Sequence, residues 1–147
     1  MAYPVSMRIR VLFLLTLASL LFSSFRSPLG EKAIEVDFSV LAGFPYKEGM
    51  SLPAEIKKLD GKLVRLVGFL RNEEQQVACH EFWLVNQNCD CQGGPKMNEW
   101  VFCTMAGDKT VDLGDEPGIV VGRLEVGEKK EGEFVLSLYR LEVQKVD

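Results

Sequence analysis

Four cysteines are the residues of this sequence whose chemistry is most distinctive. Cys79, Cys89, Cys91 and Cys103 all fall within 25 consecutive positions, and His80 follows the first of them. Four thiols and one imidazole can supply a tetrahedral zinc site or a soft copper(I) site. The Cys-x-Cys spacing differs from structural zinc sites, in which more widely spaced cysteine pairs recur. A metal held by Cys89, Cys91 and His80 is therefore one interpretation of the cluster.

Disulfide bonds are the interpretation that an exported domain of this size favours. A bridge between Cys79 and Cys103 is expected because neighbouring strands are predicted to carry them, and it would stabilise the fold by roughly 3 kcal/mol. A bridge between Cys89 and Cys91 would close a very small ring, so it would be strained, easily reduced and redox-active. No cofactor is expected, apart from zinc or copper under the metal interpretation.

The cysteine loop also contains residues that can contact a ligand or a partner. Gly-Gly-Pro most often makes a tight reversal, and Asn98 is expected to bond backbone groups in the loop. His80, the only histidine, should point away from Cys79, because adjacent residues of a strand face opposite sides. A surface position is therefore expected for His80. The candidate contact residues of the loop are Cys89, Cys91, Gly93, Gly94, Pro95 and Asn98.

Two tryptophans and two phenylalanines can form a platform on which a sugar or a base stacks. They are Trp83 with Phe82, and Trp100 with Phe102. Alternation along a strand places neighbours on opposite faces, so one member of each pair is expected in the core. Core positions are the expectation for all four, and an exposed tryptophan would be the informative exception. A carbohydrate-binding barrel stays open as a third function on this basis.

Composition and charge indicate a globular domain that does not bind nucleic acid. The chain has 147 residues, of which 47% are hydrophobic and 26% charged, and its formal net charge is -4. Without the first 25 residues, which hold Arg8 and Arg10 but no acidic residue, the net charge becomes -6. Because an acidic surface repels phosphate backbones, we expect no nucleic-acid partner.

The N-terminal residues have the pattern of a secretory signal peptide. Arg8 and Arg10 precede an apolar run over 11–22, and Ser23 and Ser24 follow it. The run is short for a membrane span, which needs about 20 residues. No Ala-x-Ala cleavage site follows, so an uncleaved anchor is the alternative. We expect an exported protein, periplasmic or anchored to the inner membrane facing the periplasm, that contacts membrane only through an uncleaved N-terminal segment.

The rest of the chain is patterned as strands. Apolar residues alternate over 32–44, which predicts a half-buried strand or an extended arm, and a short helix is predicted over 53–59. Gly68 and Gly122 interrupt strand patterns, and a glycine inside a strand indicates a sharp bend in a curled sheet. A change of apolar phase near Leu138 and Tyr139 predicts a β-bulge. Together these patterns predict a small closed barrel, with strands over 62–71, 77–86, 100–105, 119–126 and 133–146.

The region from about 51 to 146 resembles a bacterial family of exported proteins of unknown function. The resemblance begins with Pro53–Phe69 and continues with Cys89–Val101, where the family has a Cys-Cys-Phe-Gly loop followed by Pro and Asn. Here Asp90 separates the two cysteines and the phenylalanine is missing. The resemblance implies a barrel like the oligonucleotide/oligosaccharide-binding (OB) fold and a location outside the cytoplasm. It implies no established chemistry.

The sequence thus predicts a mainly β protein in three parts. Residues 1–25 form a signal peptide or anchor helix, 26–50 an N-terminal extension with a strand, and 51–147 an OB-like β-barrel with one short helix. The function predicted is a binding or accessory module of the cell envelope, not an enzyme, whose partner is an envelope protein or a small ligand. The alternative is thiol redox chemistry or zinc or copper handling through the Cys-x-Cys loop.

Overall fold

The computed structural model describes residues 30–72, 78–86 and 94–147. The chain divides into two compact units, residues 1–31 and 32–147, and every element named below belongs to the second. The predicted signal peptide or anchor, residues 1–25, lies outside the described residues. No helix in the described ranges is long and apolar enough to cross a membrane.

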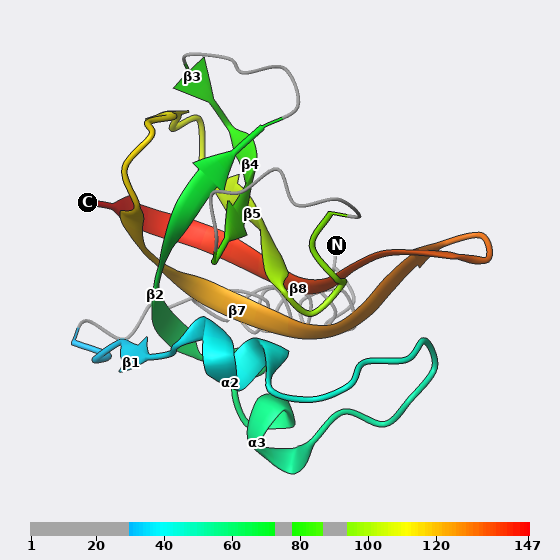
Figure 1. Ribbon diagram of the computed structural model, residues 1–147. Coiled ribbons are helices and arrows are strands. Elements are labelled where there is room, and N and C mark those ends of the chain that lie inside the picture. Colours follow the sequence, from blue (N-terminus) through cyan, green and yellow to red (C-terminus); the bar gives the residue numbers. More distant parts are fainter. Residues whose placement is uncertain (1–29, 73–77, 87–93) are drawn as a thin grey trace, which may run out of the picture. The chain divides into compact units, whose positions relative to one another are not determined.

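The strands of the second unit follow one another in a ring of pairings (Figure 1). β2 pairs with β4, β4 with β5, β5 with β8 and β8 with β7, and β7 pairs back onto β2. All of these pairs are antiparallel except β5 with β8. The prediction of a mainly β fold is confirmed. The strands of the ring are β2 (Leu63–Arg71), β4 (Glu81–Val85), β5 (Trp100–Met105), β7 (Gly118–Glu131) and β8 (Phe134–Val146).

Three short strands lie outside this ring of pairings. β1 (Ile34–Glu35) pairs in parallel with the first part of β2. β3 (Ala78–Cys79) pairs with β6 (Val111–Asp112) in a separate two-stranded sheet. The strand predicted over 77–86 is therefore divided, so that its beginning and its end belong to different sheets.

The core lies on one face of each strand of the ring. In β2, β4 and β5, buried residues alternate with exposed or half-buried ones, as a period of two requires. Gly68 and Gly122 stand where neighbouring backbone comes close. A β-carbon at Gly68 would lie 2.7 Å from the carbonyl oxygen of Val85, and one at Gly122 would collide with the carbonyl oxygen of Glu142.

The N-terminal extension differs from the strand predicted over 32–44. After β1 the chain forms a helix, α2 (Phe38–Ala42), instead of continuing as a strand. Asp37 caps this helix, because its carboxylate accepts a hydrogen bond of 2.7 Å from the amide of Ser39. Phe38 and Leu41, three positions apart, are both buried and anchor one helical face in the core. The alternating pattern was misleading because some of the alternating residues, such as Phe38, also lie on the buried face of the helix.

The second helix, α3 (Ala54–Lys57), forms where the sequence predicted it and buries Ile56. It lies close to α2 in Figure 1, on the same side of the strands. The turn that follows places Gly61 at a φ of 69°, a left-handed conformation that glycine adopts without strain. This turn leads directly into β2, so α3 is the last element before the ring of strands.

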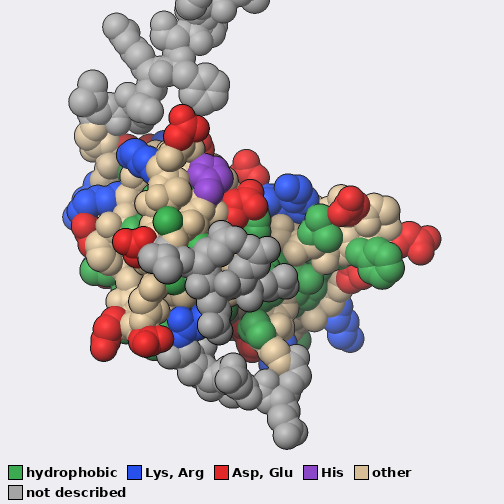
Figure 2. Space-filling view, turned by 90° about the horizontal axis from the view of Figure 1, so that it is seen from above, with side chains coloured by type: hydrophobic (Ala, Val, Ile, Leu, Met, Phe, Trp, Pro, Cys, Tyr) green, Lys and Arg blue, Asp and Glu red, His purple; other side chains and the backbone are tan. Residues whose placement is uncertain are grey.

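The hairpin of β7 and β8 is longer than predicted and extends beyond the ring as an arm (Figure 1). The charged turn predicted at 128–132 is largely strand, since β7 continues to Glu131. A bulge occurs at the predicted position, but its extra residue lies in β7 and not in the last strand. Val126 pairs with Tyr139 and Lys129 with Ser137, so two residues of β7 face one of β8. Hydrophobic side chains lie beside charged ones at the end of this arm (Figure 2), where Phe134 is 77% exposed.

Candidate functional site

The predicted bridge between Cys79 and Cys103 is wrong. Both cysteines are buried, and no disulfide joins them. Cys103 lies in β5 opposite Phe82, whereas Cys79 lies in β3 opposite Val111. Since β3 and β5 belong to different sheets, the two cysteines are not on neighbouring strands. The amide nitrogen of Asn72 lies 3.4 Å from the Cys79 sulfur, within hydrogen-bond reach.

Cys103 is a poor candidate for thiol chemistry. Its side chain is fully buried, and burial raises the pKa of its thiol well above the usual range. Because the thiolate is the reactive form, this environment makes the sulfur a weak nucleophile. The prediction for His80 is confirmed, since it is exposed while Cys79 faces inward. The His80 Nδ1 atom lies 3.0 Å from the carbonyl oxygen of Lys109.

The cysteine loop is described only at its end. Cys89, Cys91 and Gly93 lie outside the described residues. Among the described residues, no group of three or more metal-binding side chains occurs. Gly94 and Pro95 are exposed, and Gly94 has the left-handed φ of 66° that suits a tight reversal.

Asn98 has a structural position and not a surface one. It is 2% exposed, and its side-chain amide donates a 2.8 Å hydrogen bond to the carbonyl of Phe44 and a longer one to that of Ala42. The prediction that it bonds backbone is confirmed, but one carbonyl belongs to the last residue of α2 and the other to the chain just after it, not to the loop of Asn98. Asn98 therefore links the start of β5 to the N-terminal extension.

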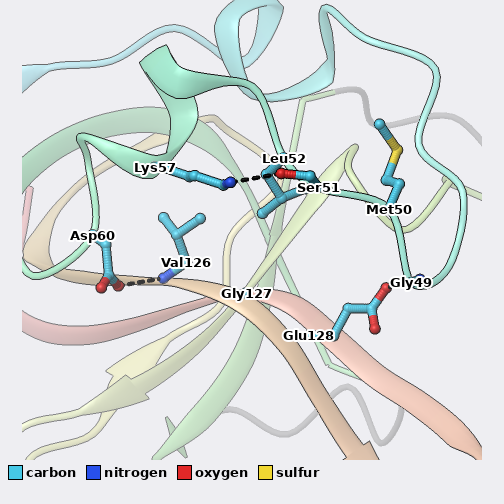
Figure 3. A pocket seen from close by; sticks show the side chains of 9 residues that line it. All are labelled: Gly49, Met50, Ser51, Leu52, Lys57, Asp60, Val126, Gly127 and Glu128. Carbon is cyan, nitrogen blue, oxygen red and sulfur yellow. Dashed lines mark hydrogen bonds between the residues drawn. The ribbon is translucent and has the colours of Figure 1, made fainter.

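A pocket of about 400 Å³ lies between α3, the loop before it and the bulge of β7 (Figure 3). Its charged groups are already engaged by neighbours. The ammonium of Lys57 donates to the hydroxyl of Ser51 at 2.7 Å, and the Asp60 carboxylate accepts from the amide of Val126 at 2.8 Å. The residues that line the pocket are Gly49, Met50, Ser51, Leu52, Lys57, Asp60, Val126, Gly127 and Glu128.

Glu128 joins this pocket to the hairpin arm. One carboxylate oxygen accepts hydrogen bonds from the amide of Gly49 at 2.6 Å and from the hydroxyl of Tyr46 at 2.7 Å. The other lies 3.2 Å from the ammonium of Lys130. The Gly49 amide, followed by the Tyr46 hydroxyl, lowers the pKa of Glu128. The carboxylate is thus used to hold the loop against β7, which makes this pocket a structural junction.

A second surface is the outer face of β2, β4 and β5. Because Phe82 and Leu84 of β4 point into the core, Trp83 points outward, and it is half-buried. In β5, Val101 and Cys103 are buried, so Trp100 and Phe102 share the outer face. The expectation that all four aromatic residues lie in the core holds for Phe82 alone. Trp100 and Phe102 are two positions apart, which places both on the same side.

Strand register brings these outward residues together in two rows. In one row Arg71, Trp83, Phe102 and Arg140 are successive partners across β2, β4, β5 and β8. In the other row Phe69, Val85 and Trp100 are successive partners across β2, β4 and β5. We call the set Phe69, Trp83, Val85, Trp100 and Phe102 the aromatic face.

Two arginines, Arg71 and Arg140, border the aromatic face, and each interacts with neighbouring groups. The guanidinium of Arg71 lies 5.6 Å from the ring centroid of Phe69, and it donates to the carbonyl of Gly114. Arg140 forms an ion pair of 3.0 Å with Glu125 of β7. The sequence contained a signal for this surface in the alternation around the two tryptophans. The sequence does not show that Phe69 belongs to the aromatic face, because its position there depends on the register of β2 against β4.

Comparison with known proteins supports the fold. No protein-family model matches the chain, and no curated protein matches it. Among solved structures, a DUF3299 family protein from Pseudomonas aeruginosa PAO1 is similar, with a TM-score of 0.53 and 22% sequence identity. The similarity covers 78% of this chain and 95% of that one. At this level of identity the likeness shows a shared fold.

Proposed function

We propose that this protein is a non-enzymatic binding module of the cell envelope, built on a small OB-like barrel, and that its ligand lies on the aromatic face. The ring of pairings supports the barrel, because it returns to its first strand and contains one parallel pair, β5 with β8. OB folds are partly open Greek-key barrels that bind ligands on the face of their second and third strands. In chain order, the second and third strands of this ring are β4 and β5, which carry Trp83, Trp100 and Phe102.

The aromatic face is the observation that carries the binding proposal. Large aromatic side chains contribute most when they are fully buried, and a contiguous group left partly exposed is typical of interaction surfaces. Three of the largest side chains on the paired strands, those of Trp83, Trp100 and Phe102, lie half-buried on this face instead of in the core. We further propose that the chain is a divergent relative of the exported family that residues 51–146 resemble. The fold likeness to a DUF3299 family protein supports this proposal.

Hydroxyl-radical footprinting tests the binding proposal on the full chain. We compare oxidation of Trp83, Trp100 and Phe102 in intact cells with oxidation in the purified protein. A ligand on the aromatic face should protect these rings in cells at least severalfold. Phe134, which is 77% exposed on the hairpin arm, is the internal control and should be oxidised equally in both samples. Equal oxidation of all four residues in both samples would show that the face is unoccupied and would contradict the proposal.

A reporter fusion tests the compartment separately. Residues 1–35, which include Arg8, Arg10 and the apolar run, are joined to an enzyme that is active only outside the cytoplasm. We expect activity from this fusion, and loss of activity when Leu14 and Leu15 are both changed to arginine. An inactive wild-type fusion that remains in the cytosol would remove the envelope part of the proposal while leaving the binding part unchanged.

A further inference from the structure

We propose that the ligand of the aromatic face is an uncharged oligosaccharide. This inference rests on the proposed function and names the class of ligand that the same surface would take. It depends on three observations: the placement of the aromatic side chains on one sheet face, the polar row beside them, and the charge around them. The first two concern residues of β2, β4 and β5, and the third also concerns charged residues of β7 and β8.

The arrangement of the rings suits the apolar face of a sugar. Trp83 and Phe102 are direct partners on adjacent strands, which lie about 4.8 Å apart in a sheet. Trp100 lies two residues from Phe102 on the same strand, a separation of about 6.8 Å along the strand direction. The aromatic side chains therefore cover an area larger than one sugar ring. An aromatic side chain has only two rotatable side-chain bonds, so little conformational entropy is lost when a ligand stacks on it.

A polar row lies directly beside the aromatic row. Glu81 and Thr104 are partners across β4 and β5, and each is two residues from Trp83 or Phe102 on the same face. Glu81 is exposed and Thr104 is half-buried. A carboxylate accepts hydrogen bonds and a hydroxyl both donates and accepts them, so the pair can satisfy the hydroxyl groups at the edge of a sugar. Stacking groups beside such polar groups are what an uncharged, hydroxyl-rich ring requires.

The charge around the face argues against single-stranded nucleic acid, the other ligand that stacks on aromatic platforms. Thr104 is partnered by Glu142 of β8, so Glu81 and Glu142 both stand at the polar edge. The guanidinium of Arg140 is already paired with Glu125, and that of Arg71 lies over the Phe69 ring and donates to the carbonyl of Gly114. Nucleic-acid platforms combine stacking with a positively charged groove, whereas this chain has a net charge of -4. An uncharged ligand avoids repulsion from these carboxylates.

Intrinsic fluorescence is a direct test, because the chain has only two tryptophans and both belong to the aromatic face. The full chain, purified in a mild detergent, is titrated with chitotetraose, with cellotetraose and with a thymidine oligonucleotide. We expect a saturable change in tryptophan emission with at least one of the two sugars and none with the oligonucleotide. Trp83→Ala and Glu81→Gln should each weaken sugar binding at least tenfold, and Phe134→Ala on the hairpin arm should leave it unchanged. If the alanine variant does not fold, sugar binding is measured with Trp83→Phe, which keeps an aromatic ring at this position.

The outcomes separate this inference from the proposed function. If neither sugar changes the emission while the rings are protected in cells, the oligosaccharide inference is overturned and the binding function stands. If the sugars have no effect and the rings are not protected, both fail. Saturable binding of the oligonucleotide, or sugar binding that Trp83→Ala and Glu81→Gln leave unaltered, would also overturn the inference.

Discussion

The phenolic hydroxyl of Tyr139, in β8, donates a hydrogen bond of 2.8 Å to the backbone carbonyl of Leu41 in α2. The two residues are 98 positions apart, and both are fully buried. The bond therefore joins the N-terminal extension to the last strand inside the core. It also gives a partner to a helix carbonyl that would otherwise be buried without one.

Removal of this hydroxyl should destabilise the protein. We expect Tyr139→Phe to lower the free energy of unfolding by about 1–3 kcal/mol, because it leaves the carbonyl of Leu41 buried without a donor. Urea denaturation of the full chain measures the change. Tyr46→Phe is the control, since its hydroxyl is only partly buried, and it should cost less. Equal stability of Tyr139→Phe and the wild type would contradict this account.

Tyrosine burial also predicts a loss of stability at high pH. Burial raises the pKa of Tyr139 above its ordinary value of 10.0, and burial followed by the hydrogen bond to Glu128 raises that of Tyr46. Above about pH 10 the unfolded chain loses phenolic protons that the folded chain keeps, so the free energy of unfolding falls as pH rises. For one fully buried tyrosine the slope reaches about 1.4 kcal/mol per pH unit. Denaturation curves between about pH 9 and 11 should be less steep in pH for Tyr139→Phe; an unaltered slope would contradict the prediction.

Close packing at Gly122 provides a second stability test. An alanine there would bring its β-carbon against the backbone of Glu142 in β8, which cannot move away without disturbing the β7–β8 pairing. Overpacking of this kind costs about 1–3 kcal/mol. At Gly114, by contrast, the nearest atom to an added β-carbon is the Glu116 nitrogen at 3.9 Å. We expect thermal melts to show a clear loss for Gly122→Ala and almost none for Gly114→Ala.

Cys103 should behave as a buried thiol and not as half of a disulfide. Its side chain is 0% exposed, and burial raises the pKa of the thiol. Iodoacetamide should therefore leave Cys103 unmodified in the native full chain and modify it after denaturation in guanidinium without any reductant. Mass spectrometry of the peptide that contains Cys103 measures both states. Labelling that appears only after a reductant is added would restore the disulfide interpretation.

The junction at Glu128 should loosen in acid. Hydrogen bonds from Gly49 and Tyr46 lower the pKa of Glu128 below its ordinary value of 4.5. Their stabilising effect is therefore present above about pH 4.5 and is lost as pH falls through the lower, folded-state pKa. In an NMR titration the amide proton of Gly49 should shift in that acidic range. Glu128→Gln should abolish the shift, and persistence of the shift in that variant would assign it to another group.

Sequence reasoning succeeded where a pattern is local and failed where it depends on partners. The helix at α3 was predicted correctly, because turn residues record it directly. The change of apolar phase located the bulge opposite Leu138 but not the strand that carries it. The strand predicted before residue 45 became α2, since the cap from Asp37 and burial of Phe38 outweighed the alternation. The predicted bridge from Cys79 to Cys103 was wrong because it assumed that their strands are neighbours. Strand pairing places the two cysteines in different sheets.

The sequence by itself determined the strand-rich class and the alternation of inward and outward side chains along a strand. These follow from the period of two in the backbone and from the size of the side chain at each position. Only the tertiary structure decided which outward residues become neighbours. Phe69, Trp83 and Trp100 come together because β2, β4 and β5 pair in one register, and a shift of one residue would turn their side chains to the other face.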